Sequence, residues 1–351
     1  MKENEILVID TTLDGHHGPY YSNLKSFIKN ATFEIIPLEI KNNKLSSIIS
    51  RYFYLKKIVR ISQSYRFVHF LHGDPFYILS PFLLRDKMLK RIVFTIHHLP
   101  QNKIKMYLLK HFSKKINRII VHSEYSKSIL RNNGIKNVEV IEYPSFYNYE
   151  VKKNKNMTNR EIVLTLLGGT RYDKGIDIFL EALQYLNESV KKQLLINIKG
   201  REEYFKKGYI VNILNKNNVK YDIDLNYISD KDFISNVESS DIILLPYRKI
   251  FTGNSGPMTE GVSREKCIIG PNEGNIGFLI KKYNLGYTFE AENPKSLALA
   301  IENYFKNGWQ PSKISREYRE KLKLEYFIES HNKLYKKILT ELEADKWKPP
   351  S

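Results

Sequence analysis

The chain has 351 residues, more than one hydrophobic core usually serves, so two domains are expected. Its 42% of apolar residues is ordinary for a globular protein and argues against a disordered chain. The longest apolar runs are far shorter than the roughly 20 residues of a membrane-spanning helix. A strand pattern begins at once, so we expect no signal peptide. Because Cys267 is the only cysteine, no disulfide can form within the chain, and a cytoplasmic protein is expected.

The net charge of +18 is concentrated in one part of the chain. Residues 41–118 contain 17 Lys and Arg against two acids, whereas the remaining residues include 39 basic and 36 acidic ones. Such a concentrated positive charge indicates an anionic partner for this segment. A solvated basic surface without a partner is the alternative.

Short apolar runs alternate with helix-length segments, which predicts buried parallel sheets built from βαβ units. The polar stretch 151–160 predicts a linker between an N-terminal domain, 1–150, and a second domain, 161–325. Both domains are expected to be doubly wound, with ligands beyond the carboxyl ends of the strands. Six runs lie on each side of the linker: 5–10, 33–39, 66–72, 91–97, 118–123 and 138–144, then 161–167, 194–200, 222–228, 241–247, 267–272 and 286–291.

The first candidate site is the turn LLGGTRYDKG, residues 166–175, which follows the first strand of the second domain. Gly168 and Gly169 let an anion approach the backbone, and the amides of the helix that follows attract phosphate. Arg171 and Lys174 add positive charge. The spacing matches neither a Walker A loop nor GxGxxG, so a structural turn explains the glycines equally well.

The second candidate site follows the predicted strand 241–247, in the segment TGNSGP. Its small residues leave backbone donors accessible, and Pro257 suits the first turn of the following helix. Glu260, one turn into that helix, can accept hydrogen bonds from a diol. A glutamate favoured there by the helix dipole is the alternative. The candidate ligand-binding residues of the segment are Thr252, Asn254, Ser255 and Gly256.

In the first domain, candidate residues lie at the carboxyl ends of three predicted strands. Gly15 and His16 are in a glycine-bearing loop after the first strand, and His97 ends the fourth. A histidine at that position can donate to a phosphate or position a hydroxyl. His72 and Asp74, which follow the third strand, are lesser candidates. His16 is followed by His17, but no matching carboxylate or third histidine lies nearby in the sequence, so no metal site is expected.

Taken together, these passages resemble the retaining, GT-B-fold nucleotide-sugar glycosyltransferases of the bacterial glycan-assembly group, glycosyl transferases group 1. GGTRYDKGIDIFLEAL resembles their GR…KG…AL segment, and RIIVHSEYSKSILRNNGIKNVEVIEYP resembles their passage from VHSE to a proline. FTIHHLP resembles a T-x-H-D strand end. TGNSGPMTEGVSREKCIIGPNEGNIGFLI resembles a segment with two glutamates eight positions apart. The resemblance spans most of the chain in the same order.

The resemblance implies an α/β protein with two doubly wound Rossmann-like domains that face each other across a cleft. The C-terminal helix, 326–351, would return toward the first domain. The activity implied is that of a retaining, metal-independent hexosyltransferase. Its donor, a UDP- or GDP-linked sugar, would be a substrate, and no cofactor is implied. The leaving phosphate would deprotonate the acceptor hydroxyl, so catalysis would rest on positioning and charge stabilisation.

Roles for individual residues follow from the same resemblance. Arg171 and Lys174 would neutralise the donor diphosphate, and Glu260 would bind the ribose hydroxyls. His97 would lie beside the reacting sugar. Amides from Asn254 to Gly256 would hold sugar and phosphate, and the loop with Gly15 and His16 would approach the diphosphate from the acceptor domain.

Two positions depart from the family pattern. Thr252 replaces the first glutamate of the pair, which usually contacts the transferred sugar, and His98 replaces the aspartate of the strand end. The expected reaction is sugar transfer to a growing, lipid-linked bacterial surface polysaccharide or lipopolysaccharide. One alternative is a non-hydrolysing nucleotide-sugar epimerase, which would need further acid and base carboxylates. The other is a nucleic-acid binder that uses segment 41–118. No nucleic acid is expected, because many aromatic residues of that segment lie in strand patterns.

The predicted helix KLSSIISRYFYLKKIVR, residues 44–60, mixes apolar residues with Arg51, Lys56, Lys57 and Arg60. Basic helices with an apolar face lie on anionic membrane surfaces. We therefore expect a peripheral protein on the inner face of the plasma membrane that uses these four cations on its acceptor side. Alternatively, the apolar face packs on the sheet and only the charges meet the lipid.

Overall fold

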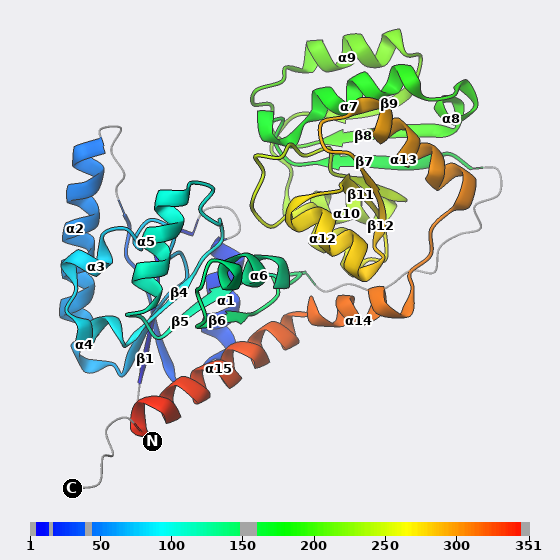
Figure 1. Ribbon diagram of the computed structural model, residues 1–351. Helices are drawn as coiled ribbons and strands as arrows, with labels where there is room; N and C mark the ends of the chain where they lie inside the picture. Colours follow the sequence, from blue (N-terminus) through cyan, green and yellow to red (C-terminus); the bar gives the residue numbers. More distant parts are fainter. Residues whose placement is uncertain (1–4, 14–16, 39–43, 148–159, 345–351) are drawn as a thin grey trace, which may run out of the picture. The chain divides into compact units, whose positions relative to one another are not determined.

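The structure, a computed structural model, describes residues 5–13, 17–38, 44–147 and 160–344 (Figure 1). The chain divides into two compact units: unit 1 is Met1–Phe146 with Leu324–Ser351, and unit 2 is Tyr147–Lys323. Each unit contains a six-stranded sheet whose paired strands are all parallel. Apart from Arg160, the predicted linker lies outside the described residues.

The sheet of unit 1 has the strand order β2-β1-β3-β4-β5-β6. Its central strands β1, β3 and β4 are fully buried, which explains why they are almost wholly apolar. The direction of winding reverses between β1 and β3, where ligands of doubly wound sheets bind. The strands are β1 (Ile6–Asp10), β2 (Ala31–Ile35), β3 (Phe67–Phe70), β4 (Ile92–Thr95), β5 (Arg118–Val121) and β6 (Val138–Val140).

Helices cover both faces of this sheet. They are α1 (His17–Phe27), α2 (Lys44–Ile61), α3 (Ser80–Leu83), α4 (Asp86–Leu89), α5 (Lys103–Ser113), α6 (Glu124–Asn132) and α15 (Leu324–Ala344). Leu55 of α2 and Phe112 of α5 belong to the core on one face, and Tyr20 of α1 and Phe327 of α15 to the core on the other. The C-terminal helix thus packs on the first unit, as expected (Figure 1).

The sheet of unit 2 has the order β12-β11-β10-β7-β8-β9, the strand order of a dinucleotide-binding Rossmann sheet. The winding reverses between β7 and β10. The strands are β7 (Ile162–Leu167), β8 (Leu194–Lys199), β9 (Lys220–Asp224), β10 (Ile242–Leu244), β11 (Cys267–Pro271) and β12 (Gly286–Phe289).

The helices of unit 2 also form two layers. They are α7 (Ile176–Ala182), α8 (Glu188–Gln193), α9 (Lys207–Lys216), α10 (Asp230–Ser239), α11 (Gly256–Ser263), α12 (Gly274–Tyr283), α13 (Pro294–Asn307) and α14 (Lys313–Lys321), with 3₁₀ turns η2 (Tyr172–Lys174) and η3 (Leu183–Tyr185). Helices α7, α9 and α13 share one core cluster, and α11, α12 and α14 share another (Figure 1).

Each of the twelve predicted runs overlaps a strand, so the prediction of two doubly wound parallel sheets is confirmed. The largest shifts occur at β2 and β9, which begin two residues before their predicted runs. Both are edge strands with partly exposed residues, so their apolar pattern is weaker than that of the buried strands.

Candidate active site

The loops after β7 and β10 lie at the carboxyl edge of the sheet of unit 2, where the ligand-binding crevice of a doubly wound sheet is expected. Gly168 and Gly175, in the loop after β7, have positive φ angles of 107° and 63°. A Cβ on Gly175 would lie 2.0 Å from the carbonyl oxygen of Pro246, so the two loops pack closely enough to require glycine. A Cβ on Gly168 would meet no described atom within 4 Å, whereas one on Gly169 would meet the carboxylate of Glu203. The backbone at Gly168 is therefore open to a ligand.

Lys174 belongs to the loop after β7, and its ammonium contacts two aromatic rings of the loop after β10. Its Nζ is 3.8 Å from the ring centroid of Tyr247 and 4.5 Å from that of Phe251. These distances are typical of cation–π contacts, which place the ammonium without neutralising it. Among the described residues, no carboxylate is within ion-pair distance of this ammonium. The crevice therefore carries a positioned positive charge that suits an anion.

Arg171 is placed differently. Its Nε and Nη2 donate to both carboxylate oxygens of Asp173, at 2.9 and 2.8 Å, and about half of its side chain is exposed. The hydrogen bonds from Arg171 lower the pKa of the Asp173 carboxyl. A diphosphate would have to share this guanidinium with Asp173. The sequence did not single out Arg248, which pairs with Asp177 and packs 3.9 Å from the ring centroid of Tyr172.

The segment between β10 and α11 lies at the same carboxyl edge of the sheet as Lys174. Ser255 caps the helix, because its Oγ accepts a hydrogen bond from the backbone N–H of Met258 at 3.3 Å. The same Oγ is 3.1 Å from the hydroxyl of Tyr247, the ring that holds Lys174. Asn254 Oδ1 accepts from Asn275 near the start of α12, at 3.1 Å. Tyr247 thus connects Lys174 with Ser255, whereas no contact of Tyr247 with the other candidates Thr252, Asn254 and Gly256 is seen among the described residues.

Glu260 is buried on α11, one turn from its start. Its carboxylate accepts a hydrogen bond from Nη1 of Arg264, and the side chains are only 5% and 2% exposed. Nε of Arg264 also lies 3.9 Å from Glu238. A carboxylate has further lone pairs, so Glu260 can accept hydrogen bonds from a diol as well as from Arg264. The sequence did not predict this partner.

In unit 1 the candidate residues gather at the carboxyl edge near the β1/β3 switch point. The two carboxylate oxygens of Asp74 accept the backbone N–H groups of His97 and His98, at 3.1 and 2.8 Å. The ring Nε2 of His97 donates to the carbonyl oxygen of Leu71 at 2.8 Å. His72 Nε2 is 3.8 Å from Asp74. Asp74, a lesser candidate in the sequence, thus fixes the backbone at His97. The predicted residues Gly15 and His16 lie outside the described residues.

Behind His97 lies a buried polar cluster that the sequence did not predict. The ring of His122 is 4.9 Å from that of His97, and its Nδ1 donates to the carbonyl of Ile141 at 2.8 Å. Burial lowers the pKa of His122 to about 4, which keeps this ring neutral. Deeper in the unit, His69 is hydrogen-bonded to Tyr335 of α15 at 2.6 Å and to Thr95 at 2.8 Å. The C-terminal helix therefore supports the strands that end at His97.

The four cations proposed for membrane contact lie on α2, apart from the residues around His97. Lys56, Lys57 and Arg60 are exposed, and Arg51 is partly buried. The apolar residues Leu45, Ile48, Ile49 and Phe53 on the same helix are 65%, 46%, 46% and 63% exposed. They do not pack on the sheet, whereas Leu55 and Ile58 do.

No group of three or more His, Cys, Asp or Glu side chains within the described residues could hold a metal ion. The Asp-x-Asp pair in β9 has other contacts, because Asp222 pairs with Lys199 at 2.6 Å and Asp224 accepts hydrogen bonds from Asn226. Within the described part of the chain, no helix is both long enough and apolar enough to cross a membrane.

The comparison with protein families shows the family of the chain. The model of the family described as Glycosyl transferases group 1 matches residues 148–323, half of the chain. The chain belongs to this family. The matched residues coincide with unit 2, so the group 1 segment contains Lys174, Ser255 and Glu260. No curated protein sequence gives a significant match.

Solved structures confirm the GT-B fold for this group 1 glycosyltransferase. A glycosyltransferase from Rickettsia africae is 18% identical with a TM-score of 0.66, covering 97% of this chain and 99% of that one. HepE from Anabaena, solved with UDP, is 12% identical with a TM-score of 0.67, over 95% and 100% of the chains. The lipopolysaccharide outer core galactosyltransferase WaaB is 13% identical with a TM-score of 0.68, over 97% and 99%.

Proposed function

We propose that this group 1 enzyme transfers a sugar from a nucleoside diphosphate sugar to the hydroxyl of a growing surface glycan, with retention of configuration. The observation that carries the proposal is the Lys174 ammonium, which lies at the strand ends of the family-matched unit without a carboxylate partner among the described residues. The anionic half of a nucleotide sugar supplies the missing counter-charge. HepE, which has the same fold, binds UDP and UDP-glucose, which supports a UDP-linked donor.

The donor diphosphate sits in the crevice between the loops after β7 and β10. Lys174 contacts it directly, and Arg171 turns from Asp173 to share its charge. The backbone at Gly168 and the amides at the start of α11 approach the phosphates. Glu260, whose carboxylate accepts a hydrogen bond from Arg264, also accepts hydrogen bonds from the ribose hydroxyls.

In the chemical step, the bond between the anomeric carbon and the β-phosphate oxygen breaks while a bond from the acceptor oxygen to the same carbon forms. Negative charge grows on the leaving diphosphate, where Lys174 and Arg171 stabilise it. The leaving phosphate takes the acceptor proton, so no protein base and no metal ion are needed. His97, on the unit proposed to receive the acceptor, has its backbone fixed by Asp74.

The acceptor is a lipid-linked surface glycan, presented at the inner face of the plasma membrane. WaaB is a galactosyltransferase of the lipopolysaccharide outer core, and TarM was solved with α-GlcNAc-glycerol and UDP. The exposed apolar residues and the cations of α2 support membrane contact on this side of the enzyme.

The test is a screen of UDP- and GDP-sugars for nucleotide release, with a lipid-linked oligosaccharide as acceptor. The proposal requires acceptor-dependent release of nucleoside diphosphate and a product with the anomeric configuration of the donor. Conversion of the nucleotide sugar into its epimer would point instead to the epimerase. Retardation of oligonucleotides at about 0.15 M salt, without sugar consumption, would point to a nucleic-acid binder.

A further inference from the structure

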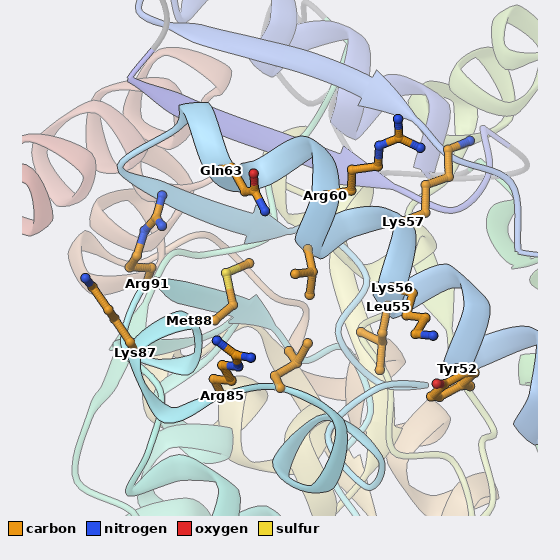
Figure 2. Close-up of a pocket in the computed structure, with 12 residues that line it drawn as sticks. Tyr52, Leu55, Lys56, Lys57, Arg60, Gln63, Arg85, Lys87, Met88 and Arg91 are labelled. Carbon is orange, nitrogen blue, oxygen red and sulfur yellow. The ribbon is translucent and has the colours of Figure 1, made fainter.

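A cavity of about 880 Å³ opens in unit 1 between α2 and the segment that contains α4. This volume falls within the range of about 300–1,000 Å³ that is typical of small-molecule sites. Figure 2 shows the lining side chains, which come from two separate parts of the chain: residues 52–63 of α2 and its C-terminal turn, and residues 84–91 around α4. Neither part belongs to the nucleotide-sugar crevice of unit 2.

The charged side chains that line this pocket are all cationic. No Asp or Glu is among its described lining residues. Four of the cations, Lys57, Arg60, Arg85 and Lys87, have no ion-pair partner within the described part of the chain. Asp86, the acid of α4, is outside the lining and pairs with Lys115 at 3.1 Å. The cations are Lys56, Lys57, Arg60, Arg85, Lys87 and Arg91 (Figure 2).

The remaining wall of the pocket is largely apolar. Leu55 and Leu84 are buried, and Val59 and Met88 are partly exposed. A free inorganic anion would leave this wall in contact with water. An occupant that combines a phosphate with a hydrocarbon portion would satisfy both the cations and the apolar wall.

The pocket lies at the end of the sheet opposite to His97. Arg91 immediately precedes β4 and His97 follows it, so the two residues lie at opposite ends of the same strand. Gln63 also comes before a strand of the sheet, four residues ahead of β3. The reacting groups of doubly wound enzymes gather at the carboxyl ends of the strands. A phosphate bound near Arg91 is therefore held for anchoring and not for reaction.

We propose that this pocket binds a membrane lipid by its phosphate head group, with the adjoining hydrocarbon against Leu55, Val59, Leu84 and Met88. The proposal deepens the proposed membrane association and rests on it. A basic surface attracts anionic lipids without a fixed stoichiometry, whereas this pocket would bind one lipid per chain. The exposed apolar residues at the start of α2 continue from this pocket along the same helix.

Short-chain lipids below their micelle concentration separate this pocket from general adsorption to a bilayer. We would titrate the full-length protein with dihexanoyl phosphatidic acid and measure the affinity by calorimetry. Each of two comparison ligands keeps one part of phosphatidic acid. Glycerol phosphate has the phosphate head group without the acyl chains, and dihexanoyl phosphatidylcholine has the acyl chains with a zwitterionic head group. We expect one bound phosphatidic acid per chain and markedly weaker binding of both comparison ligands.

Two variants change the pocket in different ways. Arg85→Gln with Lys87→Gln removes two cations and is expected to weaken binding by roughly thirtyfold. Val59→Phe fills the cavity without changing any charge, and should weaken binding by a similar factor. Lys25→Gln with Lys29→Gln, on and just after α1, removes the same charge from an exposed surface of the same unit and should leave the affinity unchanged.

Equal affinity for glycerol phosphate would overturn the proposal in favour of a site for a soluble phosphate. Unchanged affinity in Val59→Phe, with native circular dichroism, would show that the lipid binds outside the pocket. Binding of UDP to the same samples, followed by thermal shift, tests the nucleotide site independently. Lipid binding that is lost while UDP binding persists, or the reverse, therefore tells the two proposals apart.

Discussion

Glu260 and Arg264 form an ion pair at the C-terminal end of α11, one helical turn apart, with 5% and 2% of their side chains exposed. A buried carboxylate with a buried guanidinium contributes little net stability, but removing one partner strands the other charge away from water. The stability of unit 2 therefore depends on Glu260, which is also the proposed ribose-binding residue. A loss of activity on mutating Glu260 has two possible causes that need to be separated.

We predict that Glu260→Gln lowers the free energy of unfolding by about 3 kcal/mol, because Arg264 loses its charged partner. Activity should fall by about a hundredfold. The double variant with Arg264→Met should recover much of the stability, measured by urea denaturation, but not the activity. Recovery of both properties together would show that Glu260 has only a structural role.

Lys174 provides a test of the anion site. We predict that Lys174→Met lowers kcat/KM by about a hundredfold, because the leaving diphosphate loses its nearest positioned charge. Affinity for UDP should fall as well. Folding should change little, since the lysine pairs with aromatic faces and with no carboxylate among the described residues. The matched control is Lys192→Met, an exposed lysine of α8. Normal turnover of the folded Lys174 variant would remove this residue from the site.

The strands could be predicted because each buried strand is a short apolar run, and the turn at Gly168 could be predicted because two glycines follow the first strand of unit 2. The residues that contact the candidate site residues could not be predicted from the sequence. Tyr247 follows Lys174 by 73 positions in the sequence, so only the packing of two loops brings its ring to 3.8 Å from Lys174. Likewise, the cationic pocket draws Arg60 and Arg85 from different elements, and no local pattern marks their approach.

Helix α2 shows another limit of prediction from sequence. Its apolar residues fitted both a helix packed on the sheet and one exposed to a membrane, because hydrophobicity does not indicate which surface covers a residue. In the structure the helix does both: Leu55 is 1% exposed and Phe53 is 63% exposed. Which apolar residues of α2 are buried depends on the elements that pack against the helix, and not on the helix sequence itself.

Buried histidines in unit 1 predict a loss of stability in acid. Burial lowers the pKa of His331 to about 3 and that of His122 to about 4, from the ordinary histidine value of about 6.5. From about pH 6.5 down to these lowered pKa values, the unfolded chain binds protons that the folded chain does not. The free energy of unfolding therefore falls as the pH drops below about 6.5. We predict that His331→Gln removes up to about 1.4 kcal/mol per pH unit of this dependence, measured by urea denaturation between about pH 7.5 and 5. The exposed His98→Gln should keep the wild-type slope.

We predict that transfer needs no divalent metal. Lys174 and Arg171 supply the positive charge that a metal would otherwise supply to a diphosphate. Asp222 and Asp224 are engaged by Lys199 and Asn226. Activity measured after treatment with EDTA should equal the untreated rate. A rate that collapses with EDTA and returns with magnesium or manganese would contradict this and reopen the role of the two aspartates.

The last prediction concerns bilayer binding through α2. Replacing Arg51, Lys56, Lys57 and Arg60 with Gln should greatly reduce co-sedimentation with anionic vesicles, because each cation near such a surface contributes about 1 kcal/mol. Binding should also weaken with added salt and be slight on neutral vesicles.

The apolar residues of α2 give a second, charge-free test of the same surface. Phe53→Ser should weaken vesicle binding, since 63% of this side chain is exposed and available to the acyl boundary. Phe27→Ser is the matched control, because Phe27 is 55% exposed on α1 of the same unit. Affinity for UDP should be unchanged in both variants. Equal partition of the wild type onto anionic and neutral vesicles, or equal losses from both phenylalanine variants, would contradict docking through α2 and favour a soluble acceptor.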